Sequence, residues 1–342
     1  MKNLFKNVSE ADRLRALRYT KVGTKVIYSI FRYVLLIAIG FIILYPLLYM
    51  IVTSIMSPSA YNNSTRVWIP TELNAVDNFS KAIEALNYGK AFLNTIKYEV
   101  ISALLEVASC AVIGYGFARF NFKGKKIFTA ILFLTILVPD MMVLIPRMVN
   151  YSNLDFLFIG RGIEKLVQAI GNLFGADLSG FDITPNVVDT GWTMWLPSLL
   201  GVGLRSGILI YIYIQFFSGL PRELEEAAWV DGAGPFKTFL KIAVPSSSVV
   251  FITVLVFSLI WHWNDSTLSG MYFTSNYPLA SGLSTIEIYL VQKWGIYIRQ
   301  GTPQGASILM ASCILFVVPM LIFYMIVQRG FIESIDRVGI TG

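Results

Sequence analysis

The stretch Glu226-Ala-Ala-Trp-Val-Asp-Gly232, followed after nine further residues by Ile242-Ala-Val-Pro245, decides how this chain is interpreted. It is a polar segment between two long apolar runs. Gly232 suits a helix end that turns through positive φ, and a second short helix is expected to start at Pro235 and to stop at Pro245. Small side chains at 227–228 beside the Glu226 carboxylate predict a surface onto which a soluble partner docks. The alternative is an ordinary loop between two membrane spans.

Composition places the chain in a membrane. Apolar residues make up 55% of it, charged residues only 14%, and mean hydropathy is +0.64, which is outside the range of soluble domains. Six apolar segments are each long enough to cross about 30 Å of hydrocarbon as a helix. They are 31–56, 91–117, 127–146, 192–217, 246–264 and 305–327. The sequence therefore predicts an all-α, polytopic membrane protein with about six transmembrane helices.

Basic residues set the predicted orientation. Segments 1–32, 118–126, 218–245 and 328–342 hold 17 of the 27 Lys and Arg residues. The positive-inside bias therefore puts both termini and the Glu226 segment in the cytoplasm. The uneven spread of the +6 net charge also argues against nucleic-acid binding. Because the first apolar run is too long for a signal peptide, we expect it to remain as an anchor.

The order of residues around Glu226 resembles a family pattern. It consists of Glu-Ala-Ala, three residues, Gly, nine residues, Ile, one residue and an apolar-Pro pair. This spacing is similar to that of the cytoplasmic coupling loop, or EAA motif, of the permease subunits of binding-protein-dependent ABC importers. Val244 stands where Leu is more usual. Trp263-Asn264-Asp265 and the ending 328–342 resemble the carbohydrate branch that includes the maltose-type permeases. The resemblance runs from about Ile30 to Gly342, apart from an insertion near 156–188.

This resemblance implies a type I ABC importer permease fold over 31–342, preceded by a basic cytoplasmic segment at 1–30 and carrying a coupling loop at 218–245. The residues that would contact the ATPase are Glu226, Ala227, Ala228, Asp231, Gly232, Ile242 and Pro245. The implied partners are a second homologous permease, two cytoplasmic ATPase subunits that bind ATP and Mg²⁺, an extracytoplasmic substrate-binding protein and the lipids of a bacterial-type cytoplasmic membrane. The sequence has no recognisable phosphate loop or catalytic signature, so we expect neither a cofactor nor enzymatic activity in this chain.

Charged residues inside the predicted spans are candidates for a translocation path. Glu99 and Glu106 are seven residues apart and share a helical face, and Arg205 lies midway along the fourth span. Asp140 follows Pro139 in the third span. Burying such charges in lipid is costly, so they must face one another or a wet cavity. Two interpretations stay open: a carboxylate-to-Arg205 interaction that locks the bundle, and a role on the path.

A second candidate for the path is Trp263-Asn264-Asp265, where the fifth span is expected to leave the membrane before an aromatic-rich connection. Aromatic faces beside amide and carboxylate groups suit sugars, and an interfacial aromatic belt is the alternative. His262 has no metal-ligand type partner nearby in the sequence. Cys110 and Cys313 fall inside spans, so we expect neither a metal site nor a disulfide.

Two segments outside the spans have helical patterns. Residues 4–22 mix apolar and basic residues at approximately helical spacing, which is typical of a basic helix on the membrane surface; a disordered tail is the alternative. In the insertion, apolar residues recur from Ile163 to Phe174 at the spacing of one helix face. We expect simple packing of this helix, with the membrane surface, the top of the bundle or a binding protein as alternative contacts.

The leading prediction for function is a permease subunit that forms the path for a sugar or oligosaccharide by alternating access. An importer of a non-sugar solute is one alternative. An ion-coupled secondary transporter is another, in which Glu99, Glu106 and Asp140 would relay cations. A membrane-embedded enzyme is a third alternative, but the sequence shows no recognisable nucleophile, metal cluster or cofactor loop that would support it.

Overall fold

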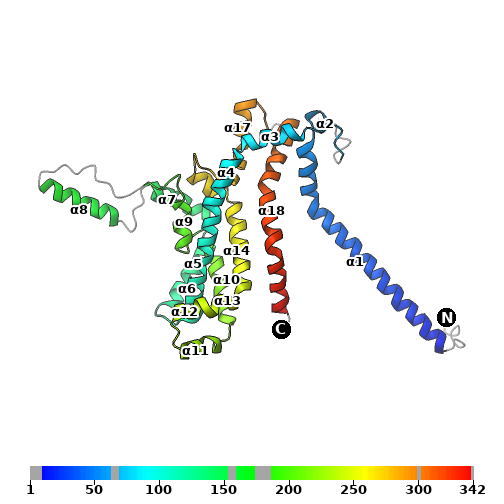
Figure 1. Ribbon diagram of the computed structural model, residues 1–342, viewed down its shortest axis with the longest axis horizontal. Coiled ribbons are helices and arrows are strands. Elements are labelled where there is room, and N and C mark those ends of the chain that lie inside the picture. The colour runs from blue at the N-terminus through cyan, green and yellow to red at the C-terminus, as the bar shows by residue number, and fades with distance from the viewer. Residues whose placement is uncertain (1–9, 63–68, 153–158, 174–185, 299–301, 340–342) are drawn as a thin grey trace.

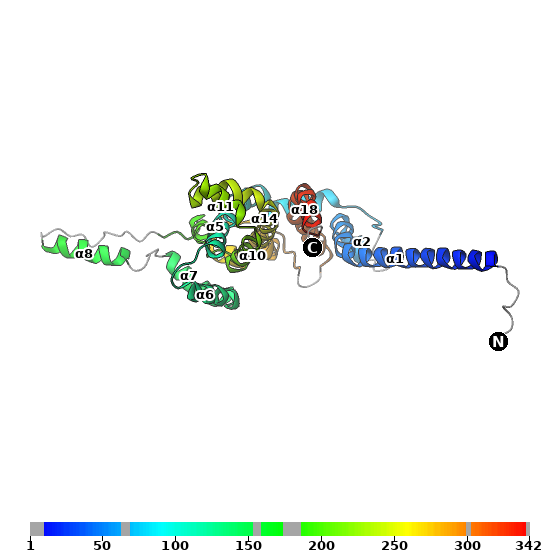
Figure 2. The ribbon, with the colours of Figure 1, turned by 90° about the horizontal axis from the view of Figure 1, so that it is seen from below.

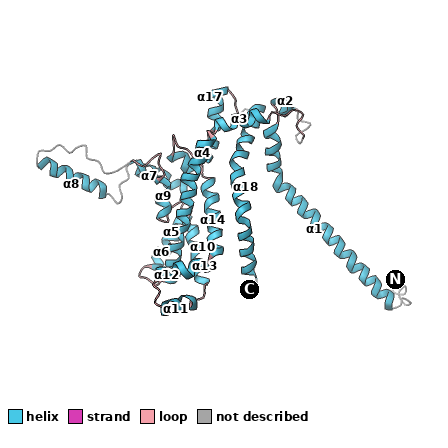
Figure 3. Ribbon diagram, in the orientation of Figure 1, coloured by secondary structure: helices cyan, strands magenta, loops and turns pink. Residues whose placement is uncertain are grey.

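The computed structural model describes residues 10–62, 69–152, 159–173, 186–298 and 302–339. Within these ranges the regular structure is helical, and one isolated β-bridge joins Met56 to Leu73. The predicted all-α fold is confirmed (Figure 3).

Three continuous helical segments are long and apolar enough to cross a membrane. The first is the apolar part, Thr24–Ile55, of α1 (Glu10–Ile55). The second is Tyr88–Arg119, in which α4 (Tyr88–Asn94), a π-helical segment (Thr95–Val100) and α5 (Ile101–Arg119) follow without a break. The third is Pro303–Gln328, which belongs to α18 (Pro303–Gly339).

Two further crossings are bent. α6 (Lys125–Leu137) and α7 (Asp140–Ser152) meet at 99°, and the helical run Pro235–Ser246 meets α14 (Ser248–Trp263) at 83°. Counting each bent pair as one span gives up to five crossings within the described residues. α10 (Ser206–Gly219) is a shorter apolar helix of 14 residues.

The predicted third and fourth spans are therefore not continuous helices. In the third, Val138 is extended (φ −75°, ψ 119°), the conformation favoured when the ring of a following proline, here Pro139, crowds the residue before it. In the fourth, α9 (Trp192–Leu199) ends before a turn in which Gly201 has φ +71°. The apolar pattern continues across both breaks, so hydrophobicity alone did not reveal them.

α5 is the central helix of the bundle. It contacts α9, α10 and α14, and Figure 2 shows it beside α10 and α14. Gly114 allows a close approach of α10, because a Cβ at this position would lie 2.4 Å from the Cβ of Tyr213. Buried side chains of Cys110, Tyr213 and Val254 from the three helices α5, α10 and α14 fill the space between them. A displacement of any of these helices is therefore transmitted to α5.

Short helices cover the end of the bundle that is uppermost in Figure 1. They are α2 (Pro58–Asn62), α3 (Ala75–Ala85), α15 (Thr267–Tyr272), α16 (Leu279–Ser284) and α17 (Ile286–Trp294). α3 and α17 pack around Leu86 and Leu290, which are fully buried with Ile308 of α18.

Two helices extend away from the bundle (Figure 1). α1 contacts α18 but diverges toward the N-terminus, and none of its apolar window is buried. Residues 10–22 are the first turns of this helix, whereas 4–9 lie outside the described residues. The helix predicted in the insertion is present as α8 (Ile159–Leu173), with Ile163, Leu166 and Ile170 exposed. Phe174 lies outside the described residues.

Candidate functional site

Segment 218–245 forms a compact loop at the end of the bundle that is lowest in Figure 1. α11 (Glu223–Val230) ends in a turn in which Gly232 has φ +79°, as its position predicts. The chain continues through α12 (Pro235–Thr238), a π-helical segment (Phe239–Ala243) and α13 (Val244–Ser246). The predicted start at Pro235 is correct. The helical run ends at Ser246, one residue beyond the predicted stop at Pro245, before it bends by 83° into α14.

The outer side of this loop combines acidic and apolar side chains. Glu226 and Ala227 are exposed, while Ala228 is buried against the loop itself. Val230 is 88% exposed and Phe236 is 68% exposed. The remaining residues of the predicted set are Asp231 and Pro245, which are exposed, and Ile242, which is half-buried. Large exposed apolar side chains next to a carboxylate are typical of a contact surface for another protein.

The inner side of α11 is attached to α5 by a buried ion pair. Arg119, the last residue of α5, donates from Nε to Oε1 of Glu225 at 2.8 Å, and each side chain is 4% exposed. Arg119 also donates from Nη2 to the carbonyl of Leu220 at 3.0 Å. Because a cation at the C-terminal end of a helix is favoured, α5 supports this arrangement. The exposed loop and the central helix are therefore mechanically connected.

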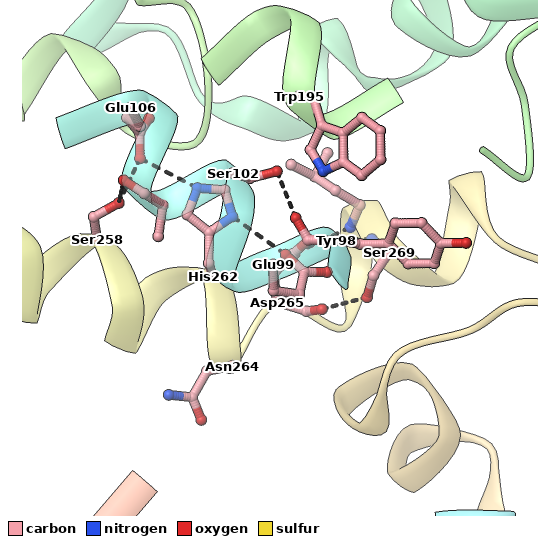
Figure 4. Close-up of polar contacts among 12 residues, drawn as sticks. Tyr98, Glu99, Ser102, Glu106, Trp195, Ser258, His262, Asn264, Asp265 and Ser269 are labelled. Carbon is pink, nitrogen blue, oxygen red and sulfur yellow. Dashed lines mark hydrogen bonds and ion pairs between the residues drawn. The ribbon is translucent and has the colours of Figure 1, made fainter. Parts of the chain in front are cut away.

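A second group of polar side chains is buried within the bundle (Figure 4). Nδ1 of His262 on α14 lies 3.2 Å from Oε2 of Glu99, and Nε2 lies 3.2 Å from Oε2 of Glu106. Ser258 donates to Oε2 of Glu106 at 2.8 Å, and Ser206 donates to Oε1 of the same carboxylate. The network thus joins the Tyr88–Arg119 run to α10 and α14.

This geometry corrects two expectations. The carboxylates interact with His262 and not with Arg205. His262, expected to have no ligand-type partner nearby, has two, which the chain separates by more than 150 positions. Helical spacing correctly placed Glu99 and Glu106 on one face, but sequence gave no signal for the histidine facing them. Among the described residues no group of three or more His, Cys, Asp or Glu is arranged to hold a metal ion.

Trp263, Asn264 and Asp265 do not converge on one site. Trp263 and Asn264 line an apolar groove between α14 and α18, and the Trp263 indole donates to the carbonyl of Phe316 at 3.1 Å. Asp265 accepts hydrogen bonds from the backbone N–H groups of Thr267, Leu268 and Ser269, which begin α15. Figure 4 shows Asn264 directed away from the network that contains His262.

Arg205 lines a hollow on another side of the bundle. It precedes α10, with its guanidinium carbon 5.1 Å from the ring centre of Trp261, and Asp140 at the α6–α7 break faces the same hollow.

Comparison with known proteins identifies the family. Residues 111–337, which contain the loop and also His262 of the buried network, match the family described as the inner membrane component of binding-protein-dependent transport systems. The chain belongs to this family. It is therefore a permease subunit of an importer of this class.

Similar proteins extend the match beyond residues 111–337. The permease is 29% identical over 190 residues to the alpha-glucoside transport system permease protein AglG of Rhizobium meliloti, an alignment that covers 56% of this chain and 42% of that protein. It is 24% identical to the arabinooligosaccharides transport system permease protein AraQ of Halalkalibacterium halodurans, covering 89% and 93%. Its fold resembles the crystal structure of a bacterial ABC transporter involved in import of the acidic polysaccharide alginate, with a TM-score of 0.63, 18% identity and coverage of 95% and 99%.

Two features of the permease were not found by sequence reasoning. Glu225 directly precedes the motif glutamate and has the same side chain, so only the α11 geometry distinguishes the buried residue from the exposed one. The second feature is a set of large apolar residues in an otherwise polar loop: Trp229, Val230 and Phe236. Large apolar side chains at a position expected to be exposed are a signal of a protein contact that the sequence offered.

Proposed function

We propose that this chain is one of two permease subunits of an ATP-driven carbohydrate importer, with energy supplied by a separate ATPase at the α11 end of the bundle. The observation that carries this proposal is the exposed surface of Glu226, Ala227, Val230 and Phe236 joined to α5 through Arg119.

Charge supports the cytoplasmic assignment of this end. Arg222, Lys237 and Lys241 lie in the loop, and Lys125 and Lys126 begin α6 beside it. Basic residues concentrate on the cytoplasmic side of membrane proteins. ATP is present on that side, so the same surface is accessible to an ATPase. Glu226 offers a carboxylate to a basic group, and Ala227 leaves room for close approach of the partner.

The exposed α1 supports a second permease subunit. Its apolar window has no buried residues, and its path diverges from the bundle of its own chain (Figure 1). A helix placed in this way fits against a neighbouring subunit as well as against lipid. We assign the remaining partners, two ATPase subunits and an extracytoplasmic binding protein, on the family membership and on the relatives that transport alpha-glucosides and arabinooligosaccharides.

The Glu99–His262–Glu106 network fits a structural role in this scheme. It is buried, and Ser206 and Ser258 donate to Glu106 beside His262, whereas Oε1 of Glu99 has no partner among the described residues. These contacts hold α5 against α14 and α10 as the helices move together. Of the six residues expected on the path, Arg205 and Asp265 border the hollow near Asp140, whereas Trp263 and Asn264 face the apolar groove at α18.

Purification tests the proposed assembly. The chain is expressed together with the genes that neighbour its own and isolated through a tag on its N-terminus. We expect a complex with one further permease and two ATPase chains that hydrolyses ATP, while the tagged chain alone hydrolyses none. Isolation of a self-sufficient homo-oligomer that transports solute without an ATPase contradicts the proposal.

A further inference from the structure

Three adjoining hollows surround Asp140 and Arg205, and both residues line all three. The first has a volume of about 320 Å³ and is also bordered by Thr135, Arg147 and Ser206. The second, of about 290 Å³, reaches Asp265 and Thr267. The third, of about 180 Å³, lies beside the break at Val138–Pro139. Small-molecule sites in proteins occupy about 300–1,000 Å³, so the combined space has the size of a ligand site.

These hollows lie at membrane depth. α10 has 14 residues between Arg205 and its end beside the coupling loop, which corresponds to about 21 Å at 1.5 Å per residue. α6 has 13 residues between Gly124 and the break, which corresponds to about 20 Å. Both charges are thus well inside a hydrocarbon layer of about 30 Å, where a charged group must face protein or water and not lipid.

The two charges are near each other but are not paired. The described residues provide no ion pair for either side chain. The Arg205 guanidinium lies over the Trp261 ring, and Asp140 is the first residue of α7, where the N-terminal end of the helix favours a carboxylate. Arg205 also has φ 58°, a conformation unfavourable for residues with a Cβ, which directs the chain into α10 from the wall of the hollow. Both groups therefore remain available to a solute.

The charge of the lining indicates which solute fits. Two carboxylates, Asp140 and Asp265, and two guanidinium groups, Arg147 and Arg205, border the hollows. Asp265 is occupied by three backbone N–H groups, and Arg147 donates to the carbonyl of Val202 at 3.3 Å. Asp140 remains as an acceptor and Arg205 as a donor. Adjacent sugar hydroxyls both donate and accept, and the two carboxylates balance the two guanidinium groups, so the lining carries no net charge that would favour an ionic solute.

We propose that the hollow between the α6–α7 break and the start of α10 is a contact site for a neutral saccharide, with Asp140 accepting from one hydroxyl and Arg205 donating to another. This inference rests on the proposed function, since it places cargo on the path of the same importer. It assigns cargo contact to this chain and not solely to its partner permease.

Cysteine accessibility in the full complex tests the site. In a background with Cys110→Ala and Cys313→Ala, the variants Asp140→Cys and Arg205→Cys are treated with a positively charged, water-soluble thiol reagent. The matched control is Ile322→Cys, at a 49% exposed apolar position on α18. We expect both hollow variants to react at least tenfold faster than the control. A neutral oligosaccharide that stimulates ATP hydrolysis, supplied on its binding protein, should slow the two reactions at least threefold.

The outcomes separate this inference from the proposed function. If no sugar-loaded binding protein stimulates ATP hydrolysis by the cysteine-free complex, the proposed function fails. If stimulation is normal but the hollow variants are unreactive, lipid or the partner permease covers these positions and the site is wrong. Reaction without protection by sugar also overturns it. As a second measurement, Asp140→Asn should lower import at saturating loaded binding protein about tenfold, with assembly unchanged, while Glu84→Gln on exposed α3 should have no effect.

Discussion

Removing one member of the Arg119–Glu225 ion pair should lower the free energy of unfolding far more than removing one member of an exposed ion pair. Each side chain is 4% exposed, so solvent screens the pair little, and a variant such as Glu225→Gln leaves the Arg119 guanidinium buried without its counter-charge. Breaking a buried pair in this way costs about 3–5 kcal/mol. Because Glu225→Gln retains the hydrogen bond from Arg119 to the Leu220 carbonyl, we expect a loss of unfolding free energy at the lower end of this range.

A double-mutant cycle measures the interaction. Arg119→Gln, Glu225→Gln and the double variant are unfolded with denaturant in mixed micelles, and co-purification of the ATPase is recorded for each. Because the double variant leaves no unpaired charge, we expect its loss to be at least about 2 kcal/mol smaller than the sum of the single losses. The exposed Lys81–Asp77 pair of α3, with side chains 22% and 42% exposed, is the control and should show at most about 1 kcal/mol. If the losses of unfolding free energy in the Arg119 and Glu225 single variants add up to the loss in the double variant, the two side chains do not form a stabilising pair and the reasoning is refuted.

Three further predictions concern the loop, the network and the topology. Glu226→Lys and Gly232→Val, the latter at a φ of +79°, should each keep the chain in the membrane but reduce ATPase association at least tenfold in a pull-down. Normal transport by both variants would show that the loop does not dock onto the ATPase. His262→Leu should destabilise the bundle by about 3–5 kcal/mol in denaturant unfolding, because two buried carboxylates lose their shared partner. Glu106→Gln should cost less, because the amide oxygen still accepts from one of the two serines, Ser206 or Ser258, and the amide NH₂ can donate to the hydroxyl of the other. Equal losses contradict this. Single cysteines replacing Ser218 and Ser275 in sealed cells should be labelled from the inside and the outside, respectively, and outside labelling at 218 reverses the topology.

Sequence patterns identified the helices whose causes are local. Apolar runs placed the spans, and Gly232 and Pro235 marked the turn and the second helix of the loop because their backbone preferences act over one or two residues. The breaks at Val138–Pro139 and near Gly201 lie within runs of unchanged hydrophobicity. Pro139 was a usable signal, since proline restricts the residue before it, but prolines at 146 and 319 are accommodated inside helices.

Side-chain partners were harder to predict than helices. The seven-residue spacing of Glu99 and Glu106 fixed their shared face, but the identity of the residue opposite depends on how α14 packs against α5. Arg205, the expected partner, precedes a different helix and faces the hollow. Trp263, Asn264 and Asp265 are consecutive, yet they separate because α14 ends at Trp263 and Asp265 caps the next helix. Adjacency in sequence therefore did not mean a shared site.

The central claim is that this permease moves saccharide with energy from ATP, and uptake by the reconstituted complex tests it most directly. Proteoliposomes that contain both permeases and the ATPase are supplied with binding protein loaded with a labelled neutral oligosaccharide. We expect uptake only with ATP on the α11 side, loss of uptake with the Glu226→Lys variant, and no effect when ion gradients are dissipated. Uptake that persists without ATP and collapses with the ion gradient contradicts the account and identifies an ion-coupled carrier.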